Sequence, residues 1–308
     1  MDTKPDRIIG SVLALTLGDA FGAPYEGGIL ERTFWSLLGK QNGKFRWTDD
    51  TQMSIDVIES LVKCGRVDQK NLAHRFAQSY RWSRGYGPGV AKVLKRIRRG
   101  HSWESASRSV YRDGSFGNGA AMRSPPLGLF FVNDTEDNLV KGAFAAASVT
   151  HAHPFGCEGA VLIALATALA YKDKSSPEII ERLCQQAKSQ EFLNRLQTAN
   201  VWLGEGKNVS PQTVAAELGN KITAVKSCVT ALYLALAFRT KPFEDLLAFT
   251  ICMGGDVDTI AAMACAIWGA SRGLDALPQV RLEQLEQFDR LKSVAQSLVE
   301  AVTNRSTI

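Results

Sequence analysis

Two short acidic sequences of the same kind lie near opposite ends of this 308-residue chain. They are Trp47-Thr48-Asp49-Asp50-Thr51 and Gly254-Gly255-Asp256-Val257-Asp258-Thr259. Each precedes apolar residues at helical spacing, so each acidic pair lies at the start of a predicted helix. If both belong to one site, the ~200 residues between them must fold around that site as one unit. We therefore expect a single domain spanning residues 1–308.

The rest of the chain also favours helices. Alternating strand patterns are scarce, whereas runs rich in Ala and Leu recur with apolar spacings of three and four. Residues 160–171 and 229–238 are nearly all apolar or small, which predicts two buried central helices. An apolar stripe over residues 282–302 predicts one amphipathic helix that packs on the body. The predicted fold class is all-α.

Composition excludes several classes of protein. The chain is 45% hydrophobic and 22% charged, which is ordinary globular composition, and its net charge of +5 falls short of a nucleic-acid signature. Six cysteines without CxxC spacing predict reduced, mostly buried thiols in a cytosolic protein. The apolar stretch at residues 8–17 is too short to span a bilayer, so we expect neither a signal peptide nor a membrane anchor.

The two acidic helix starts are candidates for metal binding. A lone Asp before an apolar run usually caps a helix, but capping requires only one acid, and each start carries two. Thr48, Thr51 and Thr259 add hydroxyls beside them. Carboxylate and hydroxyl oxygens suit Mg²⁺, Mn²⁺ or Ca²⁺ far better than Zn²⁺. Because a helix N-terminus repels a cation, the carboxylates must supply the attraction. These residues alone leave capping and metal binding both open.

Glycine-rich loops separate the predicted helices. They span residues 18–28, 39–43, 85–89, 114–126 and 151–156. Glycine lets a backbone approach a ligand closely, so these loops predict a loop-built pocket on a helical scaffold.

In their order along the chain, these motifs resemble the ADP-ribosylglycohydrolase family, which includes the dinitrogenase-reductase-activating glycohydrolases and the eukaryotic ADP-ribosylhydrolases. The resemblance covers about residues 8–273, and the ordered set is far more specific than any single motif. The motifs are Gly18-Asp19-Ala20-Phe21-Gly22-Ala23-Pro24-Tyr25-Glu26, Thr48-Asp49-Asp50-Thr51, Gly85-Tyr86-Gly87-Pro88-Gly89, Ser115-Phe116-Gly117-Asn118-Gly119-Ala120-Ala121-Met122-Arg123, Thr150-His151 and Gly255-Asp256-Val257-Asp258-Thr259. The resemblance implies a compact, single-domain orthogonal helical bundle whose loop-built metal cleft binds ADP-ribose.

The resemblance also implies two divalent cations, Mg²⁺ or Mn²⁺. The metal ligands carried over residue by residue are Thr48, Asp49, Asp50, Asp256, Asp258 and Thr259. Glu26 matches a glutamate that some members use as an additional, movable ligand, and the alternative is an ordinary surface carboxylate. The expected catalytic residues are Asp50, Asp256, Asp258 and Glu26, with one aspartate as the proton acceptor.

Two glycine loops resemble the family's ligand loops, in which backbone N–H groups cradle a pyrophosphate. The expected substrate-binding residues are Gly87, Gly89, Ser115, Phe116, Gly117, Asn118, Gly119 and His151. Phe116 is expected to orient or cover the distal ribose, and plain turn formation is the alternative for both loops. We expect little ligand contact from His153. Arg123 is either a buried partner of the carboxylates or a substrate contact.

The implied activity is hydrolysis of an N- or O-glycosidic bond between ADP-ribose and an acceptor, with a protein side chain such as arginine or serine as the expected acceptor. A non-catalytic ADP-ribose reader and a metal-dependent nucleotide phosphohydrolase are the alternatives. The reader is disfavoured because every core acidic position is present. We expect a cytoplasmic monomer that acts on an ADP-ribosylated protein or an ADP-ribose-containing small molecule, without a membrane.

A basic segment stands apart from these motifs. Trp82 and Trp103 flank the cations Lys92, Lys95, Arg96, Arg98 and Arg99. One short basic face is usually solvated helix surface, so we expect no nucleic-acid partner. A polyanionic ligand or a modified protein is compatible with this segment.

Overall fold

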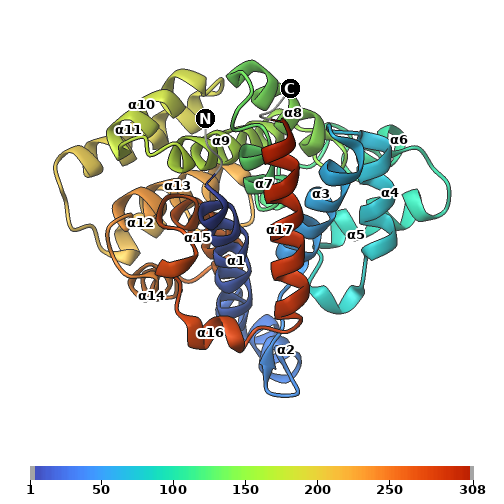
Figure 1. Ribbon diagram of the computed structural model, residues 1–308, viewed down its shortest axis with the longest axis horizontal. Coiled ribbons are helices and arrows are strands. Elements are labelled where there is room, and N and C mark those ends of the chain that lie inside the picture. The colour runs from blue at the N-terminus through green and yellow to red at the C-terminus, as the bar shows by residue number, and fades with distance from the viewer. Residues whose placement is uncertain (1–3, 306–308) are drawn as a thin grey trace.

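The computed structural model describes residues 4–305, and these fold almost entirely into helices (Figure 1). The α-helices are α1 (Pro5–Gly22), α2 (Ile29–Leu38), α3 (Asp49–Cys64), α4 (Gln69–Ser79), α5 (Pro88–Arg98), α6 (Trp103–Arg108), α7 (Pro125–Phe130), α8 (Glu136–Ser148), α9 (Pro154–Tyr171), α10 (Ser176–Gln186), α11 (Gln190–Gly204), α12 (Pro211–Glu217), α13 (Cys228–Ala237), α14 (Phe243–Met253), α15 (Val257–Arg272), α16 (Gln279–Glu283) and α17 (Phe288–Arg305). Two short strands, β1 (Lys40–Gln41) and β2 (Lys44–Phe45), form an antiparallel pair. The all-α prediction is confirmed.

Helices α1 and α15 run antiparallel through the centre of the molecule. Both are buried along most of their length, because their sequences are almost entirely apolar or small. At one end of the pair the two backbones touch: a Cβ added to Gly22 would lie 2.7 Å from Asp258 Cα. Only glycine permits that approach. It brings the end of α1 against the second acidic motif.

The remaining helices surround this pair. Helices α9 and α13 pack on α15, and α17 packs on both α1 and α3. The predicted central helices are confirmed as α9 and α13, which are buried on nearly every side. In Figure 1, α3–α6 lie to one side of α1 and α10–α14 to the other. The largest hydrophobic cluster takes in residues from Ile8 to Val302, so both ends of the chain contribute to it.

The C-terminal stripe does not form the single helix that its spacing predicts. Helix α16 ends at Glu283, and α17 begins only at Phe288. The intervening residues pair with β2: Phe45 N–H donates to Gln284 O at 2.8 Å, and Glu286 N–H donates to Phe45 O at 3.0 Å. These backbone bonds and the positive φ of Gln287 (52°) end the helical path. The break turns Glu286 toward the start of α3.

Two further predictions concern cysteines and membranes. None of the six cysteines is paired; three are buried and Cys252 is exposed. By length and composition, Pro5–Tyr25 and Pro154–Tyr171 are apolar enough to cross a membrane, and the first is longer than the stretch recognised in the sequence. Most of each segment is buried inside the protein, 83% and 78%, as expected of core helices.

Candidate metal centre

The first acidic motif is held by a residue that sequence reasoning did not assign. Asp19 of α1 accepts hydrogen bonds from the Thr48 and Thr51 backbone N–H groups, each at 3.0 Å, and from Thr51 Oγ1 at 2.6 Å. Its carboxylate therefore satisfies amides at the start of α3 that no carbonyl within the helix can reach. Thr48 adds the local cap, since its Oγ1 accepts from Asp50 N–H at 3.2 Å. Asp19 is a charged residue within the apolar sequence of α1, and this exception was the signal in the sequence that it holds another segment.

The second acidic motif is held by a glycine turn. Gly255 has φ +82°, and a Cβ there would lie 2.1 Å from Asn220 O. Both the positive φ and the close contact therefore exclude a side chain at position 255. Asp256 N–H donates to Asn220 O at 3.0 Å, and Gly27 N–H donates to Gly255 O at 2.9 Å. These bonds place the loop that carries Glu26 beside the start of α15.

The two motifs, about 200 residues apart in sequence, meet in space. Asp19, Asp50 and Asp258 each offer a carboxylate oxygen within 4.8 Å of the others. Glu26, Asp256 and Asp258 form a second such group, and Asp258 belongs to both. Neither group includes Asp49. Thr259 Oγ1 donates to Asp50 Oδ2 at 3.4 Å, and Thr48 Oγ1 donates to the same oxygen at 3.0 Å.

Five aspartates lie at this centre or beside it: Asp19, Asp49, Asp50, Asp256 and Asp258. Within residues 4–305, neither Lys nor Arg forms an ion pair with these five aspartates. Burial, and then the neighbouring carboxylates, raise the pKa of Asp49, Asp50 and Asp258 well above the usual range. Burial also raises the pKa of Asp19 and Asp256 to about 6. Buried like charges of this kind need protons or a cation.

The donor set fits a hard divalent cation. Asp50 Oδ1 is buried and has no hydrogen-bond partner within the described part of the chain. A buried carboxylate oxygen without a donor is costly unless something else compensates it. Two groups of carboxylates with adjacent hydroxyls are the ligands that Mg²⁺ or Mn²⁺ prefers, whereas the soft or nitrogen ligands typical of Zn²⁺ are missing from the two groups.

A buried ion pair braces the approach to α3. Arg84 pairs with Glu286 and donates to Trp47 O at 2.6 Å, and its guanidinium lies 3.5 Å from the centre of the Trp47 ring. Glu286 also accepts from Trp47 N–H at 3.2 Å. The pair thus fixes the residue immediately before Thr48. Sequence reasoning missed it because nothing in the local pattern of Arg84 or Glu286 indicates the partner.

The predicted ligand loop at residues 115–119 is tied to the segment after Asn220. Asn118 N–H donates to Ile222 O, and Ala224 N–H donates to Phe116 O, each at 3.0 Å. The Asn118 side chain, which is predicted to contact substrate, donates through its amide nitrogen to Asp256 and to Ser227 Oγ. It therefore orients a carboxylate of the centre. Ser115 Oγ accepts from Gly117 N–H at 3.3 Å, which forms a local turn.

An open cavity of about 380 Å³ adjoins the second carboxylate group. The residues that line it are Glu26, Gly27, Gly28, Asn220, Lys221, Ile222, Gly255 and Asp256. The carboxylates of Glu26 and Asp256 and the glycine turn at Gly255 line this cavity. The cavity is therefore the approach to the centre. Lys221 supplies a positive charge at its wall.

His151 is buried beneath the 115–119 loop. Arg123 donates to Thr150 Oγ1 at 2.8 Å, and the Thr150 hydroxyl shares a hydrogen bond with His151 Nδ1 at 2.8 Å. His151 Nε2 lies 3.1 Å from the position of a Cβ on Gly119. Burial, and then the Arg123 charge, lower the pKa of His151 to about 3. The imidazole is neutral near pH 7.

Arg123 donates hydrogen bonds to uncharged oxygens around the ligand loop. Its guanidinium is buried and donates to Gly119 O at 2.5 Å, and it lies 4.6 Å from the centre of the Phe76 ring. Burial lowers its pKa to about 10. Arg123 therefore holds the ligand loop from below. It donates no hydrogen bond to a carboxylate in the described part of the chain, but its charge interacts with that of Asp49, so both predicted roles stay predictions.

The remaining predicted substrate residues lie at the surface. Gly87 precedes Pro88 at the start of α5, and the Tyr111 ring covers Gly89. Phe116 is 50% exposed, and its ring lies 5.6 Å from that of His153 in an edge contact. His153 therefore supports the ring that was predicted to cover ribose. Neither Gly87 nor Gly89 lines the cavity beside Asp256.

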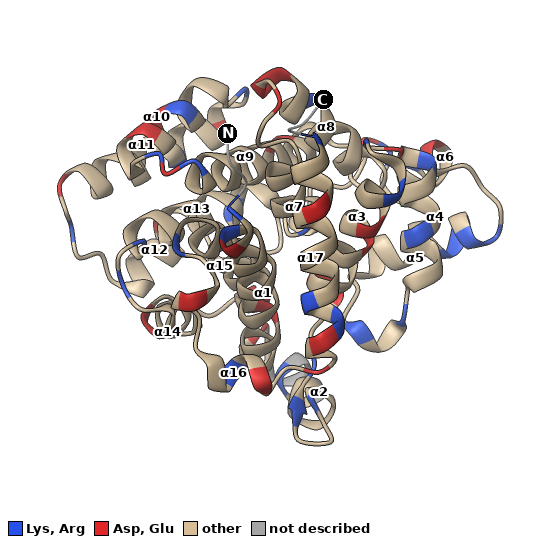
Figure 2. Ribbon diagram, in the orientation of Figure 1, with Lys and Arg blue, Asp and Glu red and all other residues tan. Residues whose placement is uncertain are grey.

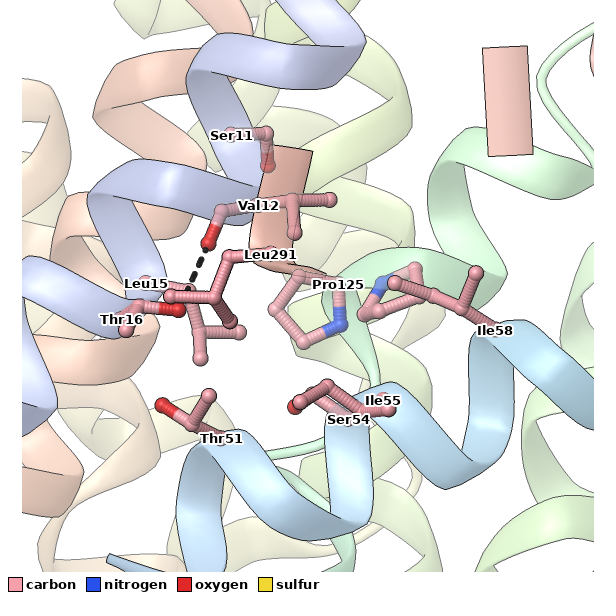
Figure 3. A pocket seen from close by; sticks show the side chains of 11 residues that line it. Ser11, Val12, Leu15, Thr16, Thr51, Ser54, Ile55, Ile58, Pro125 and Leu291 are labelled. Carbon is pink, nitrogen blue, oxygen red and sulfur yellow. Dashed lines mark hydrogen bonds between the residues drawn. The ribbon is translucent and has the colours of Figure 1, made fainter. Parts of the chain in front are cut away.

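A small void behind the centre is not a ligand site. Thr51 and Ser54 of α3 face Val12 of α1 and Leu291 of α17 across it (Figure 3). Its volume is about 10 Å³, which holds at most one water. The hydroxyls on the α3 wall are already bonded, since Ser54 Oγ donates to Asp50 O at 2.8 Å and Thr51 Oγ1 donates to Asp19. The void is a packing gap.

Comparisons with known proteins agree over nearly the whole chain. Residues 1–307 match the family described as ADP-ribosylglycohydrolase. The human ADP-ribosylhydrolase ARH3 is 33% identical over 95% of this chain and 92% of its own length. The ADP-ribosyl-[dinitrogen reductase] glycohydrolase of Rhodospirillum rubrum is 28% identical over 91% and 90%. A solved structure described as an ADP-ribosylglycohydrolase-related protein complex superposes with a TM-score of 0.73 at 25% identity, covering 97% of this chain and 98% of that one.

Proposed function

The chain belongs to the ADP-ribosylglycohydrolase family, and from this premise we propose that it is a metal-dependent hydrolase that releases ADP-ribose from a protein side chain. The observation that carries the proposal is the unpartnered oxygen of Asp50, buried in the first carboxylate group, which shares Asp258 with the second. A site that only bound a neutral ligand would gain nothing from so much uncompensated negative charge.

We propose that the centre holds two divalent cations, Mg²⁺ or Mn²⁺, one at each carboxylate group. Asp50 and Asp258 would hold the first, with Asp19 beside them, and Glu26, Asp256 and Asp258 would hold the second. When bound, such cations supply Lewis acidity to a water nucleophile and fix the hydroxyls of a ribose. Thr48, Asp49 and Thr259 remain predicted ligands that neither three-carboxylate group contains.

The chain's own residues supply charge and orientation to this reaction. Glycosidic cleavage passes through an oxocarbenium-like transition state, which a negatively charged cleft stabilises. A carboxylate of Asp50, Asp256 or Asp258 is the proposed proton acceptor, because burial raises the pKa of each, to about 6 for Asp256, and a raised pKa suits a general base. His151 is unsuited to that role, since its pKa is lowered to about 3. Its neutral imidazole lies beneath the 115–119 loop.

The experiment incubates the protein with peptides that carry ADP-ribose on arginine or on serine, with Mg²⁺ or Mn²⁺ present, and separates the products by chromatography. Free, intact ADP-ribose that appears only with cation supports the proposal. AMP and ribose phosphate would support the nucleotide phosphohydrolase, which the same ligands could serve. Binding without any product would support a reader. The acceptor, a cytoplasmic location and action as a monomer stay predictions.

A further inference from the structure

The positive charge of this protein is concentrated in one segment beside the site. Residues 81–112 contain nine Lys and Arg and a single acid, Glu104, a net charge of +8. Since the whole chain carries +5, the remainder carries −3. Figure 2 shows the corresponding blue segments around α5 and α6. The proposed reaction centre does not account for this asymmetry.

One face of α5 carries most of the exposed charge. Lys92 is followed three and four residues later by Lys95 and Arg96, and Arg99 follows these two at the C-cap of the helix; we call these four residues the basic strip. Within the described residues, none of them pairs with a carboxylate. Like charges at such spacings destabilise a helix. The four like charges therefore destabilise the helix, and their one aromatic contact, of Lys95 with the Tyr80 ring, does not neutralise charge.

The helix dipole explains only part of this pattern. Cations in the last turn of α5, such as Lys95 and Arg96, are stabilised by the carbonyl end of the helix. Lys92 lies before that turn, and Arg112 lies in a loop outside any helix. The dipole also gives no reason for the near absence of acids over 32 residues (81–112).

The loop that leads into the strip lies beside the first acidic motif. A Cβ on Gly85 would lie 3.8 Å from Asp49 Oδ1, so the loop before α5 borders the first acidic motif. From Gly87, at about 1.5 Å per residue, Lys92 lies roughly 8 Å and Arg99 roughly 18 Å along the helix. An extended peptide advances about 3.3 Å per residue, so two to about six residues would cover the same length. The strip thus matches a short segment next to a residue held at the centre.

We propose that the basic strip binds an acidic segment of the ADP-ribosylated protein, next to the modified side chain; this inference rests on the proposed function. Charge complementarity identifies the partner. A short peptide can engage the strip alone, whereas a longer nucleic acid would extend over a remainder whose net charge is −3. The strip then gives modified residues next to an acidic segment a higher kcat/KM than other modified residues.

The test uses two peptides with the same ADP-ribosylated residue, in the linkage that the wild-type protein hydrolyses. One carries Glu at the second to sixth positions on either side, and the other carries Gln there. At low ionic strength, kcat/KM is expected to be roughly tenfold higher for the Glu peptide, and the preference should vanish in about 0.5 M NaCl. No preference for the Glu peptide would overturn the inference.

A triple variant locates the effect. Lys92→Gln, Lys95→Gln and Arg99→Gln together should remove the preference and leave kcat/KM for the Gln peptide unchanged. The control removes three other exposed lysines, Lys141, Lys241 and Lys292, also by change to Gln, and should retain the preference. If the strip variant keeps the preference, or loses activity equally on both peptides, the inference is wrong.

Two binding measurements separate the remaining outcomes. Fluorescence anisotropy of the unmodified Glu peptide should show binding that the strip variant loses. If no peptide is hydrolysed but this binding persists, the proposed function fails and the strip still binds acidic peptide. If a single-stranded oligonucleotide binds the strip more tightly than the Glu peptide does, the partner is nucleic acid and the inference is overturned.

Discussion

The protein has two regions of concentrated like charge, and they differ in burial. The acidic centre gathers Asp19, Asp50, Asp256 and Asp258 in the interior, where each is at most 5% exposed. The basic strip gathers cations on the solvent-exposed face of α5. Water screens the strip, so its charges need no compensation. The buried carboxylates cannot be screened in this way, and burial raises the pKa of every one of them.

This difference indicates how strongly each region needs a partner. The acidic centre requires a cation or protons to be stable in its folded form, so its partner should bind tightly and change stability. The basic strip loses little when it is empty, so its partner should bind weakly and change only association. Four experiments on buried carboxylates test the first half of this comparison, from the largest expected effect to the smallest.

The largest effect is expected from Asp258→Asn, because Asp258 belongs to both carboxylate groups. Loss of one carboxylate should lower kcat/KM for the ADP-ribosylated peptide by about 10³-fold. The melting temperature of the cation-free protein should rise at the same time, since a buried like charge is removed. Steady-state kinetics and calorimetry measure the two changes. Asp245→Asn, on the exposed face of α14, is the control. Retained activity would contradict the metal centre.

Removal of cations should destabilise the folded protein. A cation present at about 100 times its Kd contributes roughly 2.7 kcal/mol, which corresponds to a melting temperature about 5–10 °C higher than in chelator. Thermal unfolding in EDTA and in Mg²⁺ or Mn²⁺ measures the difference. Asp258→Asn should show little of this shift. If the melting temperature in EDTA equals the melting temperature in Mg²⁺ and in Mn²⁺, protons alone compensate the carboxylates.

Asp19→Asn tests whether the carboxylate that holds α3 also matters for cation binding. An amide cannot accept from all the Thr48 and Thr51 donors, so Asp50 should lose its position and cation affinity should fall about 10–100-fold in a calorimetric titration. Asp68→Asn is a matched control, because Asp68 caps α4 by accepting from Asn71 N–H far from any carboxylate group. Unchanged affinity in Asp19→Asn would reduce Asp19 to a helix cap.

The smallest effect is expected at Asp56, a buried acid of α3 outside the centre. Burial raises its pKa from 3.8 to about 7, opposed by a hydrogen bond from Ser79. Between these two pH values the folded state keeps a proton that the unfolded state releases, so stability falls as pH rises through this window. Asp56→Asn should remove that fall and gain roughly 1 kcal/mol relative to wild type by pH 8, after the cost of burying an amide.

The measurement for Asp56 is the melting temperature at pH 5 and at pH 8. The difference between Asp56→Asn and wild type should be larger at pH 8. Asp137→Asn, at an exposed position in the first turn of α8, should show no such dependence. A difference that shrinks as pH rises would mean that Asp56 is ionised in the folded protein and better solvated than its burial implies.

Much of the fold could be predicted from periodicity. The apolar runs of α9 and α13 and the starts of α3 and α15 lie where the sequence places them, because a local pattern determines them. The C-terminal helix could not be predicted correctly. Its stripe is continuous in sequence, but the backbone bonds from β2 to residues 284 and 286 interrupt it. Those bonds join residues about 240 positions apart, which no periodicity reports.

The candidate centre also has features that the sequence predicts and features that it does not. The sequence by itself determined the residue types at the two acidic helix starts and the glycines around them, because capping and tight turns depend on neighbours in the chain. Only the tertiary structure decided that Asp19 holds Thr48 and Thr51, that Asn118 contacts Asp256, and that Arg84 and Glu286 brace Trp47. These contacts join segments that are far apart in the sequence, and only the packing of the whole core brings such segments together.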